Sequence, residues 1–171
     1  ILWHIMKIYS KFGYNDFVIC LGYKGDMIKE YFANYFRYNS NLTVDLHDNK
    51  IEIHDSVCEP WRITLVDTGD NTMTGGRIKR AERFIDGEEF MLTYGDGVAD
   101  IDIDQLVKFH HRHGRKATLT SVMPSERFGI ISFGEDGSVQ NFMEKPKDGG
   151  SWINAGFFVL NKDVIDYIDG D

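Results

Sequence analysis

A short apolar run that stops abruptly in a glycine-rich turn constrains this chain more than any other stretch. Residues 90–94 have the composition of a buried strand, and Gly95-Asp96-Gly97 follows directly. Glycine lets the backbone turn sharply and approach a ligand closely. The pattern therefore predicts Asp96 at the carboxyl end of a strand, where ligands bind in open α/β sheets. A carboxylate there suits Mg²⁺, and capping of the next turn explains the same aspartate equally well.

Strand-like and helix-like patterns alternate along most of the chain. The patterns predict strands at 17–21, 63–66, 90–94, 116–123 and 153–160. They predict helices at 1–9, at 26–36 with Asp26 as N-cap, at 72–84, from Asp102 or Asp104 to 113, and from Asp163, as N-cap, onward. Two hairpins, at 42–53 and 128–143, interrupt the alternation. The predicted fold is a three-layer α/β domain over residues 1–171, with a mostly parallel, mixed sheet and β-hairpin insertions.

Composition narrows the classes of partner. The 171 residues carry a formal net charge of −8, which argues against nucleic acid or an anionic membrane as the main partner. No apolar run reaches the roughly 20 residues that a membrane helix needs. Cys20 and Cys58 have neither the spacing of metal ligands nor that of a disulfide framework. Two free thiols are typical of a reducing cytoplasm, which is the expected location.

Two further segments contain groups that bind anions. Thr74-Gly75-Gly76-Arg77 puts glycines and a guanidinium at a helix start, which favours a phosphate, although Gly-Gly also marks plain turns. Lys145 follows Glu144 just before a proline; the lysine is suited to a phosphate and the glutamate to sugar hydroxyls.

Other titratable clusters fit metals poorly. The aspartates at 100, 102 and 104 lack the glycine and the closing glutamate of a calcium loop. The histidines at 110, 111 and 113 lack the i, i+4 spacing of a helical zinc pair. A strand exit followed by a helix N-cap explains the first cluster, and a helix C-terminus in solvent explains the second.

The order of these pieces along the chain resembles the sugar-phosphate nucleotidyltransferases. The matching segments, taken from the amino end, are Val66-Asp67-Thr68-Gly69, Met73-Thr74-Gly75-Gly76-Arg77, Tyr94-Gly95-Asp96-Gly97, Arg127-Phe128-Gly129, Glu144-Lys145-Pro146 and Ile153-Asn154-Ala155-Gly156. The resemblance covers essentially the whole chain. It implies a Rossmann-like nucleotidyltransferase fold, in agreement with the alternation of strands and helices.

The resemblance also implies substrates and roles. The expected reaction joins CTP and α-D-glucose 1-phosphate, and the expected assembly is a homo-oligomer. Asp96 would bind Mg²⁺ as a catalytic residue together with Arg77 and Lys145. The implied nucleotide-binding residues are Thr72, Arg77 and Gly95, and the implied sugar-phosphate-binding residues are Gly129, Glu144, Lys145 and Asn154.

Two elements of the family pattern would lie outside this sequence. The family begins with a strand and a glycine-rich phosphate loop, which we expect upstream of Ile1, and a second metal-binding aspartate is expected beyond Asp171. The chain is thus expected to be an internal part of the enzyme, inactive alone. Two alternatives stay open at this point: a nucleotidyltransferase that uses UTP or dTTP, and a non-catalytic module that binds a sugar phosphate or a nucleotide.

Overall fold

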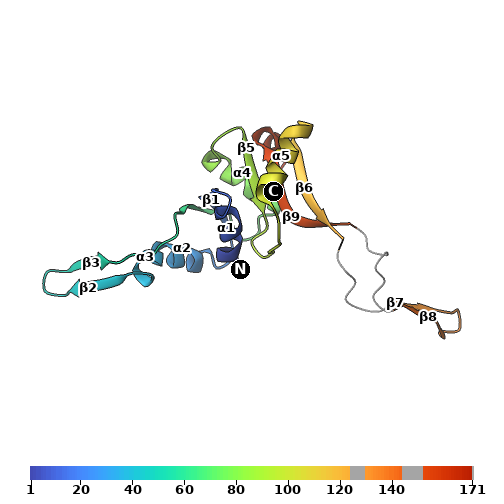
Figure 1. Cartoon of the computed structure of the whole chain (residues 1–171), viewed down its shortest axis with the longest axis horizontal. Helices are drawn as coiled ribbons and strands as arrows, with labels where there is room; N and C mark the ends of the chain where they lie inside the picture. The colour runs from blue at the N-terminus through green and yellow to red at the C-terminus, as the bar shows by residue number, and fades with distance from the viewer. Residues whose placement is uncertain (124–129, 144–151, 171) are drawn as a thin grey trace. The chain divides into compact units, whose positions relative to one another are not determined.

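The computed structural model describes residues 1–123, 130–143 and 152–170, which fall into two compact units. The first unit comprises Trp3–Phe90 and Asn161–Asp171, and the second comprises Ile1–Leu2 and Met91–Leu160. Figure 1 labels the helices and strands in chain order.

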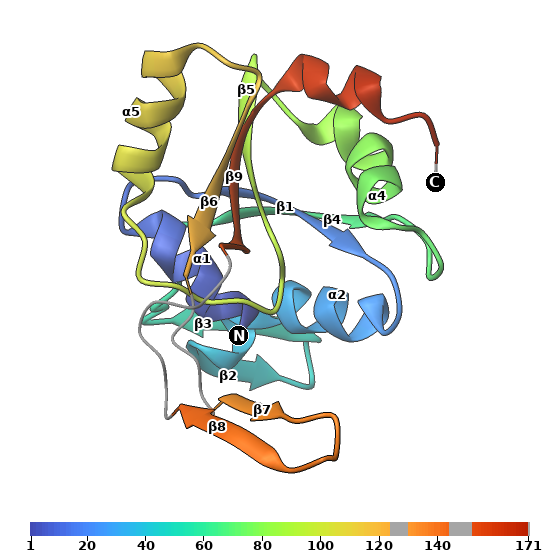
Figure 2. The same ribbon diagram turned by 90° about the vertical axis from the view of Figure 1, so that its right-hand side faces the viewer.

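A parallel pair of strands forms the centre of the first unit. β1 (Asp16–Leu21) pairs with β4 (Arg62–Asp67), and Figure 2 shows the two strands side by side. The register aligns Leu21 with Asp67 at the carboxyl ends. The loops that follow both strands therefore begin at the same edge of the pair.

Helices supply the other half of this core. α1 (Leu2–Ser10) and α4 (Thr74–Ala81) each bury one side, and a 3₁₀ turn, η1 (Glu82–Phe84), continues α4. The buried apolar residues of the unit are Ile5, Met6, Tyr9, Leu21, Val66, Ala81 and Ile165. Ile165 lies in a second 3₁₀ helix, η2 (Lys162–Tyr167), where the sequence predicted a helix capped by Asp163. That prediction was wrong in one respect, since the cap position is Asn161 and Asp163 lies inside the first turn.

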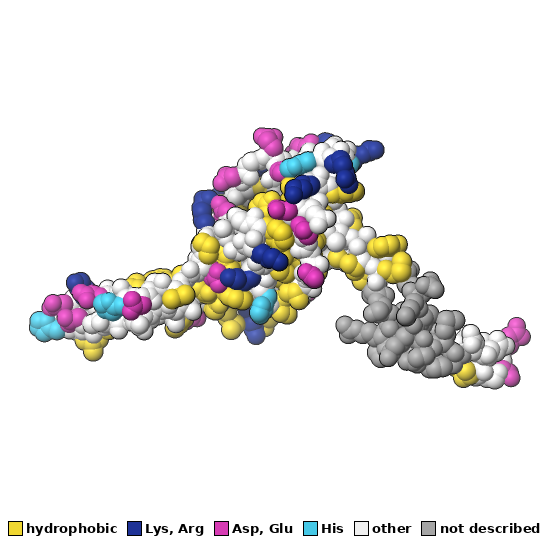
Figure 3. Space-filling model, viewed as in Figure 1, with side chains coloured by type: hydrophobic (Ala, Val, Ile, Leu, Met, Phe, Trp, Pro, Cys, Tyr) yellow, Lys and Arg dark blue, Asp and Glu magenta, His cyan; other side chains and the backbone are white. Residues whose placement is uncertain are grey.

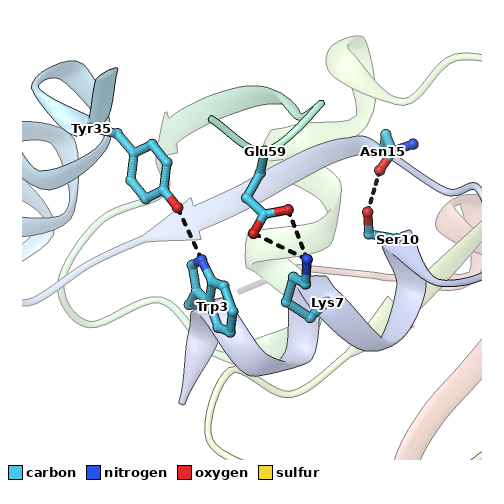
Figure 4. A network of polar contacts seen from close by, with 6 residues as sticks. All are labelled: Trp3, Lys7, Ser10, Asn15, Tyr35 and Glu59. Atoms are coloured by element: carbon cyan, nitrogen blue, oxygen red, sulfur yellow. Dashed lines mark hydrogen bonds and ion pairs between the residues drawn. The ribbon is translucent and has the colours of Figure 1, made fainter. Parts of the chain in front are cut away.

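Polar contacts tie α1 to distant parts of the same unit (Figure 4). Trp3 Nε1 donates to the Tyr35 hydroxyl at 3.1 Å, and Lys7 Nζ lies 2.9 Å from Glu59 Oε2. An ion pair this exposed contributes little to stability, about 0–1 kcal/mol. The aromatic contacts of Trp3 and Tyr35 with Trp61, at ring-centroid distances of 6.1 and 6.4 Å, therefore matter more for the packing of this helix.

The segment between β1 and β4 departs from the predicted pattern. One helix was expected from Asp26 to residue 36, but α2 (Gly25–Ala33) ends at Asn34 and a single turn, α3 (Tyr35–Tyr38), follows. The Asn34 side chain donates to the Glu30 carbonyl at 3.0 Å, a bond that competes with continued helix. Lys24, with a left-handed φ of 56°, occupies the cap position predicted for Asp26.

The predicted hairpin is present as β2 (Asn41–Asp45) and β3 (Lys50–His54). The strands pair antiparallel with each other, and all ten of their residues are exposed. Figure 3 shows acidic, basic and histidine side chains gathered on this hairpin.

A three-stranded sheet organises the second unit. Its order is β5 (Glu89–Thr93), β9 (Ile153–Asn161) and β6 (Ala117–Val122), so the last strand in sequence lies between the other two. β6 and β9 run antiparallel with an irregularity between Leu119 and Ser121. Together with the parallel β1–β4 pair, this is the mixture of strand directions that the sequence predicted.

Helix α5 (Ile103–His113) is held at both ends by local signals. Asp102 caps its amino end by accepting from the Gln105 backbone N–H at 2.9 Å, as predicted. Gly114, at a φ of 62°, ends it. The Thr118 hydroxyl on β6 lies 2.8 Å from His110 Nδ1 and 2.7 Å from His113 Nε2. Both histidines therefore join α5 to the sheet, and the prediction that they lie in solvent was wrong for His110, which is only 3% exposed.

A second hairpin consists of β7 (Ile130–Phe133) and β8 (Val139–Met143), paired antiparallel as the sequence predicted. Among the described residues, no helix is long and apolar enough to cross a membrane.

Candidate functional site

Asp96 lies in an open turn directly after β5. Tyr94, Gly95 and Asp96 are exposed, and a side chain built at Gly95 or Gly97 would meet nothing within 4 Å. Within the described part of the chain, no hydrogen bond or ion pair engages the Asp96 carboxylate. The alternative that Asp96 caps a turn is therefore wrong, because its carboxylate accepts no backbone N–H there. The strand end presents a bare anion to solvent.

Asn154, predicted to contact the sugar, lies beside this turn in the same unit. Its Nδ2 donates to the Tyr94 hydroxyl at 3.1 Å, and its Oδ1 accepts from the Gly156 backbone N–H at 2.8 Å. The Tyr94 backbone N–H in turn donates to the Gly156 carbonyl at 3.3 Å. The structure thus brings Asn154 together with the segment that carries Gly95 and Asp96.

Arg77 lies in the first unit, on the first turns of α4. Its NH1 donates to the Leu21 carbonyl at 3.1 Å and to Thr68 Oγ1 at 2.8 Å, and its NH2 donates to the Asp70 carbonyl at 3.2 Å. These bonds close the loops after β1 and β4 onto α4. The guanidinium predicted to contact the nucleotide is thus partly used within the protein, with its Nε–H and one NH2 hydrogen left over.

Thr72, also predicted to contact the nucleotide, is buried beneath the same loop. Its Oγ1 accepts from Arg80 NH1 at 2.7 Å, and Arg80 NH1 also donates to the Thr68 carbonyl at 2.7 Å. Only 7% of the Thr72 surface is exposed. A ligand would meet the loop around this residue more readily than its hydroxyl.

Cys20 contacts Arg77, and its pKa is shifted by its surroundings. Its thiol donates to the Arg77 carbonyl at 3.6 Å, and burial raises the pKa of Cys20 above its ordinary value, partly offset by the Arg77 charge. The protonated thiol is therefore favoured, as befits a structural cysteine rather than a nucleophile.

Three predicted residues, Gly129, Glu144 and Lys145, lie outside the described residues. Their roles remain predictions from the sequence.

The described residues can bind a divalent cation through the single carboxylate of Asp96. They contain no group of three or more His, Cys, Asp or Glu side chains arranged to hold a metal. A cation at Asp96 would therefore take this single carboxylate and complete its shell with water and substrate oxygens. Mg²⁺ characteristically binds in that way, with one or two carboxylates and substrate phosphates.

Sequence reasoning missed the two residues that organise these loops. Arg80 follows Arg77 by three positions on one helix, and this spacing puts both guanidiniums on one face, a signal that was available. Tyr94 was treated only as the end of a strand. Its contacts with Asn154 and Gly156, 60 and 62 residues away, carry no local signal.

The strands and helices define a Rossmann-like α/β protein with an exposed carboxylate directly after a strand. Solved structures agree on the fold. HddC from Yersinia pseudotuberculosis superposes with a TM-score of 0.63 at 20% identity, covering 98% of this chain and 65% of that one. A UDP-glucose pyrophosphorylase complexed with UDP-glucose superposes with a TM-score of 0.56 at 15% identity, covering 95% of this chain and 64% of that one.

The family model described as "Nucleotidyl transferase" matches residues 1–171, and the chain belongs to this family. It is 56% identical over 172 residues to the glucose-1-phosphate cytidylyltransferase of Salmonella typhi, and 44% identical over 171 residues to a probable glucose-1-phosphate cytidylyltransferase of Bacillus subtilis. Each match covers 100% of this chain and 66% of the relative's length.

Proposed function

We propose that the protein containing this chain transfers a cytidylyl group from CTP to α-D-glucose 1-phosphate, giving CDP-glucose and pyrophosphate. The observation that carries the proposal is the 56% identity along the whole chain to an enzyme of that name. The geometry agrees with it, since an unpaired carboxylate follows β5 where a nucleotide phosphate with its cation would bind. We further propose that residues 1–171 belong to a single nucleotidyltransferase domain.

The reaction needs little from the protein beyond placement. A phosphate oxygen of glucose 1-phosphate attacks the α-phosphorus of CTP, and the bond to pyrophosphate breaks. The sugar phosphate is already an anion at neutral pH, so no general base has to generate the nucleophile. The difficulty lies in bringing two polyanions together and in stabilising charge as it develops, so positioning and electrostatics carry the catalysis. The chemistry therefore needs neither the partly buried Cys20 thiol nor the histidines that join α5 to β6.

Mg²⁺ is the cation we propose for Asp96. When bound, it would neutralise charge on the nucleotide phosphates. Asp96 holds it through an exposed carboxylate, and Gly95 leaves room for the nucleotide beside it. The other nucleotide contacts we propose are Arg77, through the guanidinium hydrogens not used by its loop bonds, and Thr72, through its loop.

The sugar phosphate is proposed to bind Gly129, Glu144, Lys145 and Asn154. Lys145 would hold the phosphate as a point charge and complete the catalytic set with Asp96 and Arg77. Asn154 is the one of these four that the structure describes, and its exposed amide lies in the same unit as Asp96.

We propose that the protein assembles as a homo-oligomer, as the family resemblance implies. We also propose that it is cytoplasmic and binds neither nucleic acid nor a membrane, in agreement with the net charge of −8 and the two free thiols. Light scattering of the purified protein would measure the assembly directly.

The decisive experiment is pyrophosphate release from the full-length protein that contains this chain. The assay supplies glucose 1-phosphate, Mg²⁺ and CTP, UTP, dTTP or ATP in turn. Release with CTP alone supports the proposal. Release with another nucleotide keeps the chemistry and corrects the base. Folded protein that is silent with all four nucleotides would overturn the proposal in favour of a binding module.

A further inference from the structure

Tyr94 crosses from the end of β5 to β9 and rests on a glycine. Its backbone N–H donates to the Gly156 carbonyl at 3.3 Å, and a Cβ at Gly156 would lie 2.8 Å from Tyr94 Cδ2 and 3.5 Å from Cε2. No side chain fits at that distance. Gly156 also has a φ of 79°, in the left-handed region that glycine adopts without strain. The aromatic ring therefore has its place because residue 156 is glycine.

The same ring holds the Asn154 amide at one end while the backbone holds the other. The Gly156 N–H can only donate, so the atom facing it at 2.8 Å must be the amide oxygen of Asn154. That assignment turns the amide nitrogen toward the Tyr94 hydroxyl, 3.1 Å away. The Asn154 side chain is thus oriented by two partners, one on β9 itself and one from β5.

This arrangement leaves the amide half used. A carboxamide has two N–H donors and an oxygen with two lone pairs. One donor goes to Tyr94 and one lone pair to Gly156, which leaves one donor and one acceptor on an exposed side chain. A sugar hydroxyl both donates and accepts, so the remaining pair of groups is complementary to it.

We propose that Tyr94 is a positioning residue for sugar-phosphate binding, acting through the Asn154 amide. The inference rests on the proposed function and on the sugar contact proposed for Asn154. The last side-chain torsion of asparagine is broad, so an amide without its Tyr94 partner samples several orientations. Such an amide would have to be ordered when the sugar binds, and that ordering would lower the affinity. The hydrogen bond to Tyr94 orders the Asn154 amide before the sugar binds.

The ring is held independently of the hydroxyl, which makes a clean variant available. Phe158, two residues beyond Gly156 on β9, meets the Tyr94 ring edge-on at a centroid distance of 5.9 Å and an interplanar angle of 70°. Tyr94→Phe keeps this contact, the contact with Gly156 and the backbone bond. It removes only the acceptor for Asn154.

The test is a double-mutant cycle in the full-length protein, with Tyr94→Phe, Asn154→Ala and both together. KM is measured for glucose 1-phosphate and for CTP, and thermal midpoints report folding. Tyr94→Phe is expected to raise KM for glucose 1-phosphate about three- to tenfold, the range of one neutral hydrogen bond, with KM for CTP and the midpoint unchanged. In the Asn154→Ala background the Tyr94 change is expected to add nothing further.

Two outcomes would overturn the inference. One is a Tyr94→Phe effect of equal size with and without Asn154, or an equal rise in both KM values, because Tyr94 would then act on its own or on the fold. The other is an Asn154→Ala enzyme with a normal KM for glucose 1-phosphate. That result would rule out the sugar contact of Asn154 but would leave the proposed cytidylyl transfer unaffected. If the unaltered protein turns over no nucleotide, the proposed function fails instead. Calorimetric binding of glucose 1-phosphate to the same variants then decides the Tyr94 role.

Discussion

The glycine-containing turns after β4 and after β5 differ in how their polar groups are bonded. After β4, residues 67–70 form a turn that is hydrogen-bonded to α4. Arg77 donates to the Thr68 hydroxyl and to the Asp70 carbonyl, and Arg80 donates to the Thr68 carbonyl. After β5, residues 94–97 form a turn whose carboxylate, Asp96, is exposed and unbonded within the described residues. We call these the bonded turn and the open turn.

The difference separates groups that stabilise the fold from groups that are free to bind a ligand. Thr68 is fully buried at 0% exposure, and every partner of the bonded turn lies in the same unit, so its arginines contribute first to stability. A group can act on a ligand only with atoms that the protein has left unsatisfied. In the open turn the whole carboxylate meets that condition, whereas in the bonded turn only part of the Arg77 guanidinium does. Each prediction below tests this contrast.

Removing the free carboxylate should have the largest effect. Asp96→Asn in the full-length protein is expected to lower kcat for pyrophosphate release at least about a hundredfold, because a bound cation supplies several kcal/mol of charge stabilisation. Its thermal midpoint should stay within about 2 °C of the unaltered protein, since the side chain makes no contact that folding needs.

Asp70→Asn is the matched control, an exposed carboxylate in the bonded turn whose backbone carbonyl, not its side chain, accepts from Arg77. It should leave kcat nearly unchanged. Full activity in Asp96→Asn would remove the metal role and with it the contrast.

Removing the hydrogen bonds between the bonded turn and α4 should lower the stability of the fold. Arg77→Ala deletes the bonds to the Leu21 and Asp70 carbonyls and to Thr68, and the free energy of unfolding is expected to fall by about 3 kcal/mol. Urea titration measures it. Arg77→Lys should recover only part of the loss, because an ammonium cannot reproduce the planar fork.

A different result would break the contrast. If Arg77→Ala left stability intact and raised KM for CTP alone, then Arg77 would serve the nucleotide through its remaining hydrogens, as the sequence resemblance implies.

The two cysteines should report the bonded turn by their reactivity. Cys20 is partly buried against the Arg77 carbonyl and burial raises its pKa, while Cys58 is exposed. At pH 8 a thiol reagent should modify Cys20 at least about tenfold more slowly than Cys58, because both access and the thiolate fraction are lower. Peptide mass analysis of each site over time measures the two rates. Arg77→Ala should speed the modification of Cys20 and not of Cys58, because the gain in access when the turn loosens outweighs the loss of the Arg77 charge that favours the thiolate. Equal rates for the two cysteines in the unaltered protein would show that the turn opens readily.

The smallest expected effect concerns Asp102, which lies beyond the open turn and caps α5. Backbone and side-chain hydrogen bonds from Gln105 hold the pKa of Asp102 below its ordinary value of 3.8. A lowered folded-state pKa stabilises the protein above pH 3.8, and this contribution is lost as the pH falls through the folded-state pKa. Asp102→Ala should therefore lower the thermal midpoint slightly at pH 7, and the gap should narrow below pH 3.8.

Asp102→Asn gives the comparison for that measurement, because asparagine caps a helix equally well but does not titrate. At pH 7 its midpoint should lie between those of Asp102→Ala and the unaltered protein, because the cap remains but the charge is lost, and it should approach the unaltered protein below pH 3.8. A gap for Asp102→Ala that stays constant down to pH 2 would mean that the carboxylate charge contributes nothing.

Much of the fold could be predicted because its signals are local. The Asp102 cap, the Gly114 stop, the β2–β3 hairpin and the strand that ends before Gly95 depend on a few neighbouring residues and on the backbone angles they allow. The predictions that were wrong concern boundaries. Asn34 ends α2 early through a bond to the Glu30 carbonyl, and Asn161 rather than Asp163 precedes the last 3₁₀ helix. In both places several polar residues compete for one cap, and packing decides among them.

The sequence by itself determined which chemical groups this protein has and where the chain turns. It placed Asp96 directly after a strand and Arg77 at the start of a helix. Only the tertiary structure decided which of those groups remain available. Arg77 meets the Leu21 carbonyl 56 residues away, and Tyr94 meets Asn154 60 residues away. The reason is physical: backbone angles and caps depend on neighbours in the chain, whereas hydrogen-bond partners depend on strand register and on which distant segments fold together.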